Sequence, residues 1–126
     1  MAQQEYFTGE FNRSSIMDGI SAMPGGFFVY KADDQNEEII YANRALLQLL
    51  ECDDPEQFLE LTGGSFRGIV YKEDYDRVSH EIVSQLKENT SKFDQVSYRI
   101  KTRTGQIKYV EDFGSYVEDP EKGPLF

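Results

Sequence analysis

The strongest constraint on the fold is an abrupt change of period between Glu37 and Leu50, in the stretch EEIIYANRALLQLL. The run IIYA is β-branched and aromatic, as is typical of a strand, whereas RALLQLLEC reads as a helix. Asn43 stands between them and is a favoured N-cap, because its side-chain oxygen can accept from the free N–H groups of a first helical turn. The sequence therefore predicts a strand that becomes a helix without a loop.

The residues before this corner predict a hairpin and a short helix. FFVYKA, over residues 27–32, is followed by the polar turn DDQNE and then by IIYA, an order typical of a β-hairpin. Further upstream, Ile16, Ile20 and Met23 recur at helical spacing behind a serine N-cap, and Pro24 ends the pattern. This segment is expected to form a short amphipathic helix.

Two more helices are predicted after the corner. Asp54 can cap a helix that has Pro55 at its first position and Gln57 in the place of a capping box, and Gly63 stops it. The stretch YKEDYDRVSHEIVSQLKEN then predicts a long helix, which is the most regular of the helices predicted for this chain. Its apolar stripe consists of Tyr75, Val78, Ile82 and Leu86.

The last third of the chain alternates at period two. FDQVSYRIKT places Val96, Tyr98 and Ile100 on one face, RTGQ turns the chain, and IKYVEDFGSYVED runs back. A further turn, PEKG, leads to the start of another strand at residues 124–126. The expected class is α+β, with an antiparallel sheet covered by helices.

These segments, in this order, resemble a PAS domain, the sensory module of bacterial signalling proteins. GGFFVYKA, EEIIYANRALLQLL, DDPEQFLELTGGSFRGIV, KEDYDRV and YRIKTRTGQIKYVEDFGSYV carry the resemblance. It implies a five-stranded antiparallel sheet with helices over one face, in a domain of residues 24–126 preceded by a segment of residues 1–23. It also implies that Asn43 holds the corner where the helices leave the sheet; the alternative is that Asn43 is only a cap.

Two departures from the family are visible. Tyr71 and Lys72 replace the usual His-Pro before the long helix, and the family's last strand runs on past the point at which this chain ends, Phe126. We therefore expect a fragment of a longer protein, cut inside or just before its final strand. Such a sheet would need cover at an edge from the N-terminal segment or a second copy.

Composition narrows the function classes. The 126 residues suit one domain, and the formal net charge of −10 argues against nucleic acid and anionic membrane as partners.

Cys52 is the single cysteine, which excludes an internal disulfide, and we expect a buried or half-buried thiol. No apolar run reaches the length of a membrane span. The sequence reads as a cytoplasmic module, although the parent protein could be membrane-anchored.

The sequence argues against flavin-adduct chemistry, haem, a metal site and catalysis, and leaves any other cofactor unknown. GSFR, at residues 64–67, has no thiol where flavin-binding relatives of PAS domains carry a reactive cysteine. Haem-binding PAS domains use a histidine on the long helix, and His80 is the one candidate, but the helical period turns it away from the apolar stripe towards solvent. With one histidine and one cysteine there is no Cys-His pair at a readable spacing, and a Ser-His-Asp triad is not specified, because any of many serines and acids would serve, so we expect no enzyme. The acidic turn DDQNEE lacks the glycine and the terminal glutamate of a calcium loop, so we expect no metal site.

Two hypotheses for the function remain. In the first, a small apolar or amphipathic ligand binds between the sheet and the helices and shifts the link to an output domain. Its pocket would be lined by Phe66, Val96, Tyr98, Ile100 and Tyr109, although simple core packing also explains these residues.

In the second hypothesis, the domain binds no ligand and acts as a homodimer. The predicted helix of Ile16, Ile20 and Met23 would form the contact; alternatively, this helix docks on its own sheet. By resemblance, the output domain would be a diguanylate cyclase or a histidine kinase in the same polypeptide.

Overall fold

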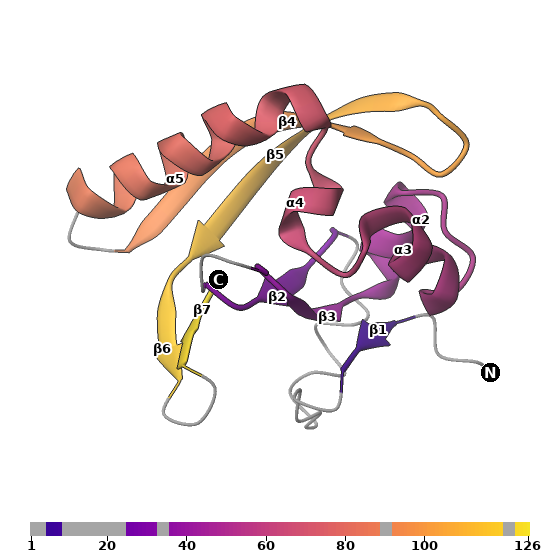
Figure 1. Cartoon of the computed structure of the whole chain (residues 1–126), viewed down its shortest axis with the longest axis horizontal. Helices are drawn as coiled ribbons and strands as arrows, with labels where there is room; N and C mark the ends of the chain where they lie inside the picture. Colours follow the sequence, from indigo (N-terminus) through magenta and orange to yellow (C-terminus); the bar gives the residue numbers. More distant parts are fainter. Residues whose placement is uncertain (1–4, 9–24, 33–35, 89–91, 120–122) are drawn as a thin grey trace.

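The computed structural model describes residues 5–8, 25–32, 36–88, 92–119 and 123–126 of the chain. Strands and helices are mixed within one body (Figure 1), which confirms the predicted α+β class. The helix predicted around Ile16, Ile20 and Met23 lies outside the described residues, so that prediction stands as it was made.

The first ladder contains three antiparallel strands in the order β1-β3-β2. They are β1 (Tyr6–Phe7), β2 (Phe28–Tyr30) and β3 (Ile39–Ala42). All four residues of β3 are buried, as a central strand with both faces covered requires. The predicted hairpin of β2 and β3 is confirmed.

The second ladder is the long hairpin of β4 (Phe93–Lys101) and β5 (Ile107–Ser115). Even-numbered residues of both strands face inwards and odd-numbered residues face outwards, the alternation that a pleated sheet imposes. Val96, Tyr98 and Ile100 therefore share the inner face, as the sequence predicts.

The third ladder joins the other two. It pairs β6 (Val117–Asp119) with β7 (Gly123–Leu125). Beyond β7, the Tyr30 N–H donates to the Phe126 carbonyl and the Phe126 N–H donates to the Tyr30 carbonyl, both at 2.8 Å. The sequence predicted one unbroken strand through IKYVEDFGSYVED, but the ladder is interrupted at Tyr116, whose N–H donates to the Lys92 carbonyl at 3.0 Å.

Three short helices follow β3, and one long helix precedes β4. They are α2 (Arg44–Leu49), α3 (Pro55–Thr62), α4 (Phe66–Ile69) and α5 (Tyr75–Glu88), with a 3₁₀ turn, η1 (Lys72–Asp74), before α5. Asp54 caps α3 as predicted, since its Oδ1 accepts from the Gln57 N–H at 2.9 Å. Gly63 ends α3 with φ 68°, a left-handed conformation that favours glycine.

The hydrophobic core lies between the inner face of the sheet and the helices. Phe66 of α4 is 1% exposed and stacks on Tyr30, with 4.5 Å between ring centroids and 4° between ring planes. Val78 and Ile82 of α5 are buried against the same cluster. Cys52 is buried as predicted, and burial raises the pKa of its thiol.

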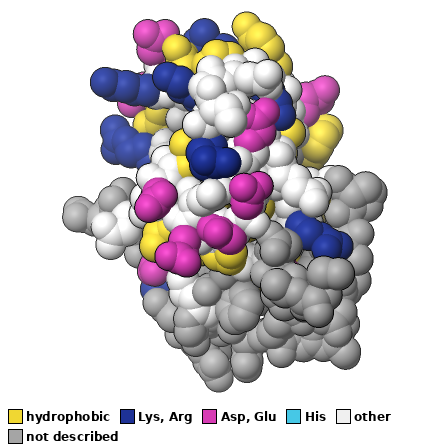
Figure 2. All heavy atoms as spheres, turned by 90° about the vertical axis from the view of Figure 1, so that its right-hand side faces the viewer, with side chains coloured by type: hydrophobic (Ala, Val, Ile, Leu, Met, Phe, Trp, Pro, Cys, Tyr) yellow, Lys and Arg dark blue, Asp and Glu magenta, His cyan; other side chains and the backbone are white. Residues whose placement is uncertain are grey.

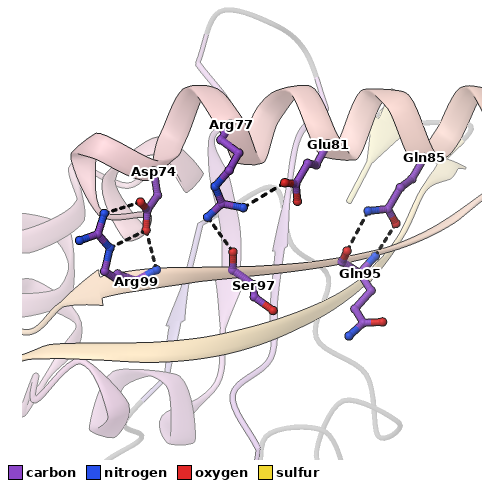
Figure 3. Close-up of polar contacts among 7 residues, drawn as sticks. All are labelled: Asp74, Arg77, Glu81, Gln85, Gln95, Ser97 and Arg99. Carbon is purple, nitrogen blue, oxygen red and sulfur yellow. Dashed lines mark hydrogen bonds and ion pairs between the residues drawn. The ribbon is translucent and has the colours of Figure 1, made fainter.

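Helix α5 lies along the outer edge of β4 and satisfies that strand's backbone with side chains (Figure 3). The amide of Gln85 donates to the Gln95 carbonyl and accepts from the Gln95 N–H, each at 2.8 Å. About two turns earlier, Arg77 donates to the Ser97 carbonyl at 2.9 Å. These bonds occupy groups that an edge strand would otherwise present to another strand.

An ion pair anchors the start of this helix to the same strand. The guanidinium of Arg99 donates to both carboxylate oxygens of Asp74, at 2.6 and 3.0 Å, and the Arg99 backbone N–H donates to Oδ2 at 2.9 Å (Figure 3). The hydrogen bonds from Arg99 lower the pKa of Asp74 to about 2. Such bidentate, charge-assisted contacts are among the stronger polar interactions in proteins.

On the face shown in Figure 2, acidic and basic side chains are interspersed. The net charge of −10 is therefore not gathered into one acidic surface there. Among the described residues, no helix combines the length and the apolar character needed to cross a bilayer.

Candidate functional site: a cleft on the inner face of the sheet

A cleft of ≈470 Å³ opens between β2, β5 and α5. Phe28 and Tyr30 contribute one wall from β2, Val110 contributes another from β5, and Ile82 and Leu49 close it from α5 and α2. Among the described residues, β5 pairs only with β4, so its other edge faces β2 across this cleft.

Aromatic rings form much of the cleft wall. Phe28 and Tyr30 stack with their centroids 5.9 Å apart, and Phe126 stacks on Tyr30 at 5.3 Å. Phe66 lies behind them and meets Tyr98 edge-on at 6.1 Å. Rings packed in this way hold one another in place, so the wall is largely preformed.

Asn43 holds β2 in position beside the cleft. It is 0% exposed, and its Oδ1 accepts from the Leu46 N–H at 3.0 Å, which is the predicted cap of α2. The same oxygen accepts from the Phe27 N–H at 2.9 Å, and Nδ2 donates to the Gly25 carbonyl at 3.0 Å. Asn43 is therefore more than a cap, because it also ties the start of β2 to the corner.

Two acidic residues share the inner face with these apolar groups. Asp94 of β4 is 6% exposed, and its Oδ2 has no hydrogen-bond partner among the described residues. Asp112 of β5 accepts from the Tyr98 hydroxyl at 2.6 Å. Asp94 lies opposite Gly114, which makes Asp112 its diagonal neighbour across the ladder.

Burial and mutual repulsion set the ionisation of this pair. Burial, with a further contribution from the charge of Asp112, raises the pKa of Asp94 to about 6. Burial also raises the pKa of Asp112, although the hydrogen bond from Tyr98 acts in the opposite direction. The cleft therefore carries negative charge near neutral pH in surroundings that disfavour it.

The structure separates the five pocket residues named from the sequence. Tyr98 lines the cleft, whereas Phe66, Val96 and Ile100 are buried in the core beside it. Tyr109 does not line it: Tyr109 is 82% exposed on the outer face, and its assignment to the pocket wall is corrected. The period-two alternation of β5 turns Val110 inwards in its place.

Sequence reasoning missed the two acids, although the sequence contained a signal for them. Asp94 precedes Val96 by two residues in β4, and Asp112 follows Val110 by two residues in β5, which is the spacing of residues on one face of a strand. A charged residue at an inward position of a sheet is costly to bury, and so marks a special environment.

His80 is exposed on α5, as the helical period predicted. Among the described residues, no three His, Cys, Asp or Glu side chains are grouped so that they could hold a metal ion. A hollow of ≈800 Å³ between α4 and the turn of the β4–β5 hairpin is lined by exposed charged residues, including Lys72, Glu73 and Arg103, together with buried apolar residues such as Ile69 and Val70.

Comparisons with known proteins agree with this architecture. The chain is similar in structure to a PAS domain from a two-component sensor histidine kinase, with a TM-score of 0.65 and 20% identity, covering 87% of this chain and 86% of that chain. It is also similar to the PAS domain of a protein from Colwellia psychrerythraea, with a TM-score of 0.54 and 14% identity, covering 88% and 92%. No curated protein sequence matches significantly. A family model described as the PAS fold matches residues 39–126, more than half of the chain, and the chain therefore belongs to the PAS-fold family.

Proposed function

We propose that this PAS domain is a sensory module that binds a small ligand in the cleft between β2, β5 and α5. The observation that carries the proposal is a buried carboxylate, Asp94, which lies without a hydrogen-bond partner among the described residues beside a wall of aromatic rings. Ligand sites in proteins are typically concave and mostly apolar, with a few placed polar groups. The cleft has this composition.

A signal would leave the cleft through the strands that line it. Tyr30 lies in the cleft wall and is bonded through its backbone to Phe126, so displacement of β2 would move the strand next to it. In our proposal this movement reaches an output domain of the diguanylate cyclase or histidine kinase type in the same polypeptide, in the cytoplasm, and this chain carries no catalytic activity itself. A ligand has this effect only if it binds the two output states with different affinity.

Native mass spectrometry of the purified domain, together with an absorption spectrum, tests the proposal. We expect a bound species of defined mass that is lost from a variant with a blocked cleft, such as Val110→Trp. The exposed substitution Lys87→Ala is the matched control. A haem bound through His80 would be recognised by its colour. An unliganded mass for both the parent and the variants, with no ligand recovered from cell extract, would contradict the sensor function.

A second function, a homodimeric interaction module without ligand, is favoured by the outer face of the sheet. Its strands β4 and β5 expose large apolar side chains, namely Phe93 (61%), Ile107 (43%), Tyr109 (82%) and Phe113 (74%). Apolar groups gathered on one surface often mark an interface. The predicted helix with Ile16, Ile20 and Met23 would be the other contact. Ile20→Asp should then give a folded monomer in analytical ultracentrifugation.

A further inference from the structure

The residue that faces Asp94 across the ladder leaves space for its carboxylate. Opposite Asp94 stands Gly114, where a Cβ atom would lie 3.0 Å from Oδ2 and 3.1 Å from Oδ1 of Asp94. Any larger residue at this position would press on the carboxylate. The absence of a side chain on β5 at this point leaves room for a charged group that is 6% exposed and faces the cleft.

The buried charge has no counter-ion in the described part of the chain. The ion pairs there are Lys31–Glu38, Arg77–Glu81, Arg99–Asp74, Arg103–Asp53 and Lys108–Glu51. Neither Asp94 nor Asp112 belongs to any of them. Buried charges in proteins are normally paired or coordinate an ion, and an unsatisfied buried acceptor requires an explanation.

The surroundings indicate what kind of cation fits. A hard metal ion would need six or more oxygen ligands. This cleft offers the inward-facing carboxylates of Asp94 and Asp112 on a floor of aromatic and aliphatic side chains, and its third acidic residue, Glu111, is exposed and accepts from the Gln95 side chain. An organic ammonium group can donate to both carboxylates and place its apolar part against rings such as Phe28 and Tyr30. A neutral ligand would bring no counter-charge to Asp94 and Asp112, and an anionic ligand would be repelled.

We propose that the cleft recognises a small organic ammonium cation, whose charged head lies between Asp94 and Asp112 and whose apolar part packs against Phe28, Tyr30 and Val110. This proposal rests on the sensor function and adds the chemical class of the ligand. Tyr98 acts as a positioning residue, because its hydroxyl holds one oxygen of Asp112 and leaves the other for the ligand.

Calorimetric titration of the domain with three probes of matched shape tests the inference. Phenethylammonium, 2-phenylethanol and 3-phenylpropanoate share an aromatic ring and differ in the charge of the head group. At pH 7.5 we expect phenethylammonium to bind at least 10-fold more tightly than the alcohol, and the carboxylate to bind least. Equal affinity for the ammonium compound and the alcohol would overturn the proposal.

Single substitutions then locate the site. Asp94→Asn should weaken phenethylammonium binding at least 10-fold and leave the alcohol unaffected, whereas Asp76→Asn, the same change on the exposed face of α5, should have no effect. Affinity should also fall as the pH is lowered from 7.5 to 5, as Asp94 takes up a proton. Asp112, Tyr98 and Tyr30 are the other titratable groups that face Asp94. Unchanged binding by Asp94→Asn would overturn the proposal.

Failure of this inference is distinguishable from failure of the sensor function. A neutral or anionic molecule recovered from the cleft by native mass spectrometry would overturn the cationic ligand and leave the sensor function standing. The three-probe comparison uses the unmodified domain, so it remains decisive if Asp94→Asn does not fold. A near-ultraviolet circular dichroism spectrum of each variant reports on its packing.

Discussion

Asn43 combines three hydrogen bonds with complete burial, which makes it the polar residue on which the corner between sheet and helices depends. Its side chain serves β2 and α2 at the same time. Replacing it leaves the part-buried N–H of Phe27 without its acceptor, and leaves the buried N–H of Leu46 with only the longer contact to the backbone carbonyl of residue 43, at 3.2 Å. Each unsatisfied buried group costs about 1 to 3 kcal/mol.

We predict that Asn43→Ala lowers the free energy of unfolding by about 2 to 4 kcal/mol, because it removes a cap and orphans a second donor. Asp54→Ala is the matched control, since Asp54 only caps α3 and should cost about 1 kcal/mol. Urea denaturation of both variants measures the difference. Equal losses would show that Asn43 is merely a cap.

Asp94 gives a prediction for the pH dependence of stability. Its pKa rises from 3.8 to about 6 on folding. Between these pH values the folded protein holds a proton that the unfolded chain has released. By linkage, the contribution of Asp94 to stability is fully present below about pH 4 and is lost as the pH rises through about 6. At neutral pH the ionised carboxylate costs at most about 3 kcal/mol.

Asp94→Asn should therefore be more stable than the parent at pH 7.5, by about 1 to 2 kcal/mol. Denaturation between pH 4 and pH 7.5 should show a smaller decline for the variant than for the parent, and the decline that remains in the variant comes from Asp112, whose pKa is also raised by burial. Asp74 does not disturb this window, because its pKa is lowered to about 2 and its stabilising contribution is lost only below about pH 4. Parallel curves for parent and variant would contradict the prediction.

At the scale of elements, α5 substitutes for a neighbouring strand along the edge of β4. The side-chain amide of Gln85 carries one donor and one acceptor in the same relation as a peptide group, which is why it can bond both backbone groups of Gln95. The helix therefore closes an edge that would otherwise be open to another chain.

Gln85→Ala should lower the free energy of unfolding by about 1 to 2 kcal/mol, because two neutral hydrogen bonds are lost at an exposed edge. The amide proton of Gln95 should also exchange with solvent faster. Lys87→Ala, exposed on the same helix, controls for helix propensity. Hydrogen exchange followed by NMR measures both the free energy of unfolding and the exchange rate of the Gln95 amide proton. Unchanged exchange at Gln95 would show that the side chain does not protect this edge in solution.

Long helices and strands could be predicted from the sequence, whereas the shortest ones could not. The nine-residue strands β4 and β5 and the 14-residue helix α5 repeat their period often enough to be recognised. β1, with two residues, and α4, with four, complete no pattern of their own. They form because partners distant in sequence supply bonds, as when the Phe66 N–H donates to the Glu37 carbonyl at 3.0 Å.

For the whole molecule, the predicted fold class and family were confirmed, while the candidate site was predicted only in part. Tyr98 was found because it continues an apolar stripe. Asp94 and Asp112 were missed because the cleft is formed by β2, β5 and α5, whose mutual placement no local pattern contains. The expectation that the chain is cut inside or just before its last strand, and the division at residue 24, stay predictions.

The outer face of the sheet yields a prediction at this scale. Tyr109→Ser and Phe113→Ser should each change the free energy of unfolding by less than about 0.5 kcal/mol, because these side chains are 82% and 74% exposed. Thermal denaturation at a concentration that keeps the domain monomeric measures this effect. A loss of 2 kcal/mol or more would show that another segment covers this face.

The burial of Cys52 has a practical consequence. The only thiol of the chain is 4% exposed and has a raised pKa, so little of it is present as the reactive thiolate at neutral pH. A cysteine introduced at an exposed position, such as His80→Cys on α5, would react first with a maleimide dye. A fluorophore can therefore be attached at one chosen point without removing Cys52. Movement of α5 relative to the sheet can then be followed by fluorescence while a ligand is added.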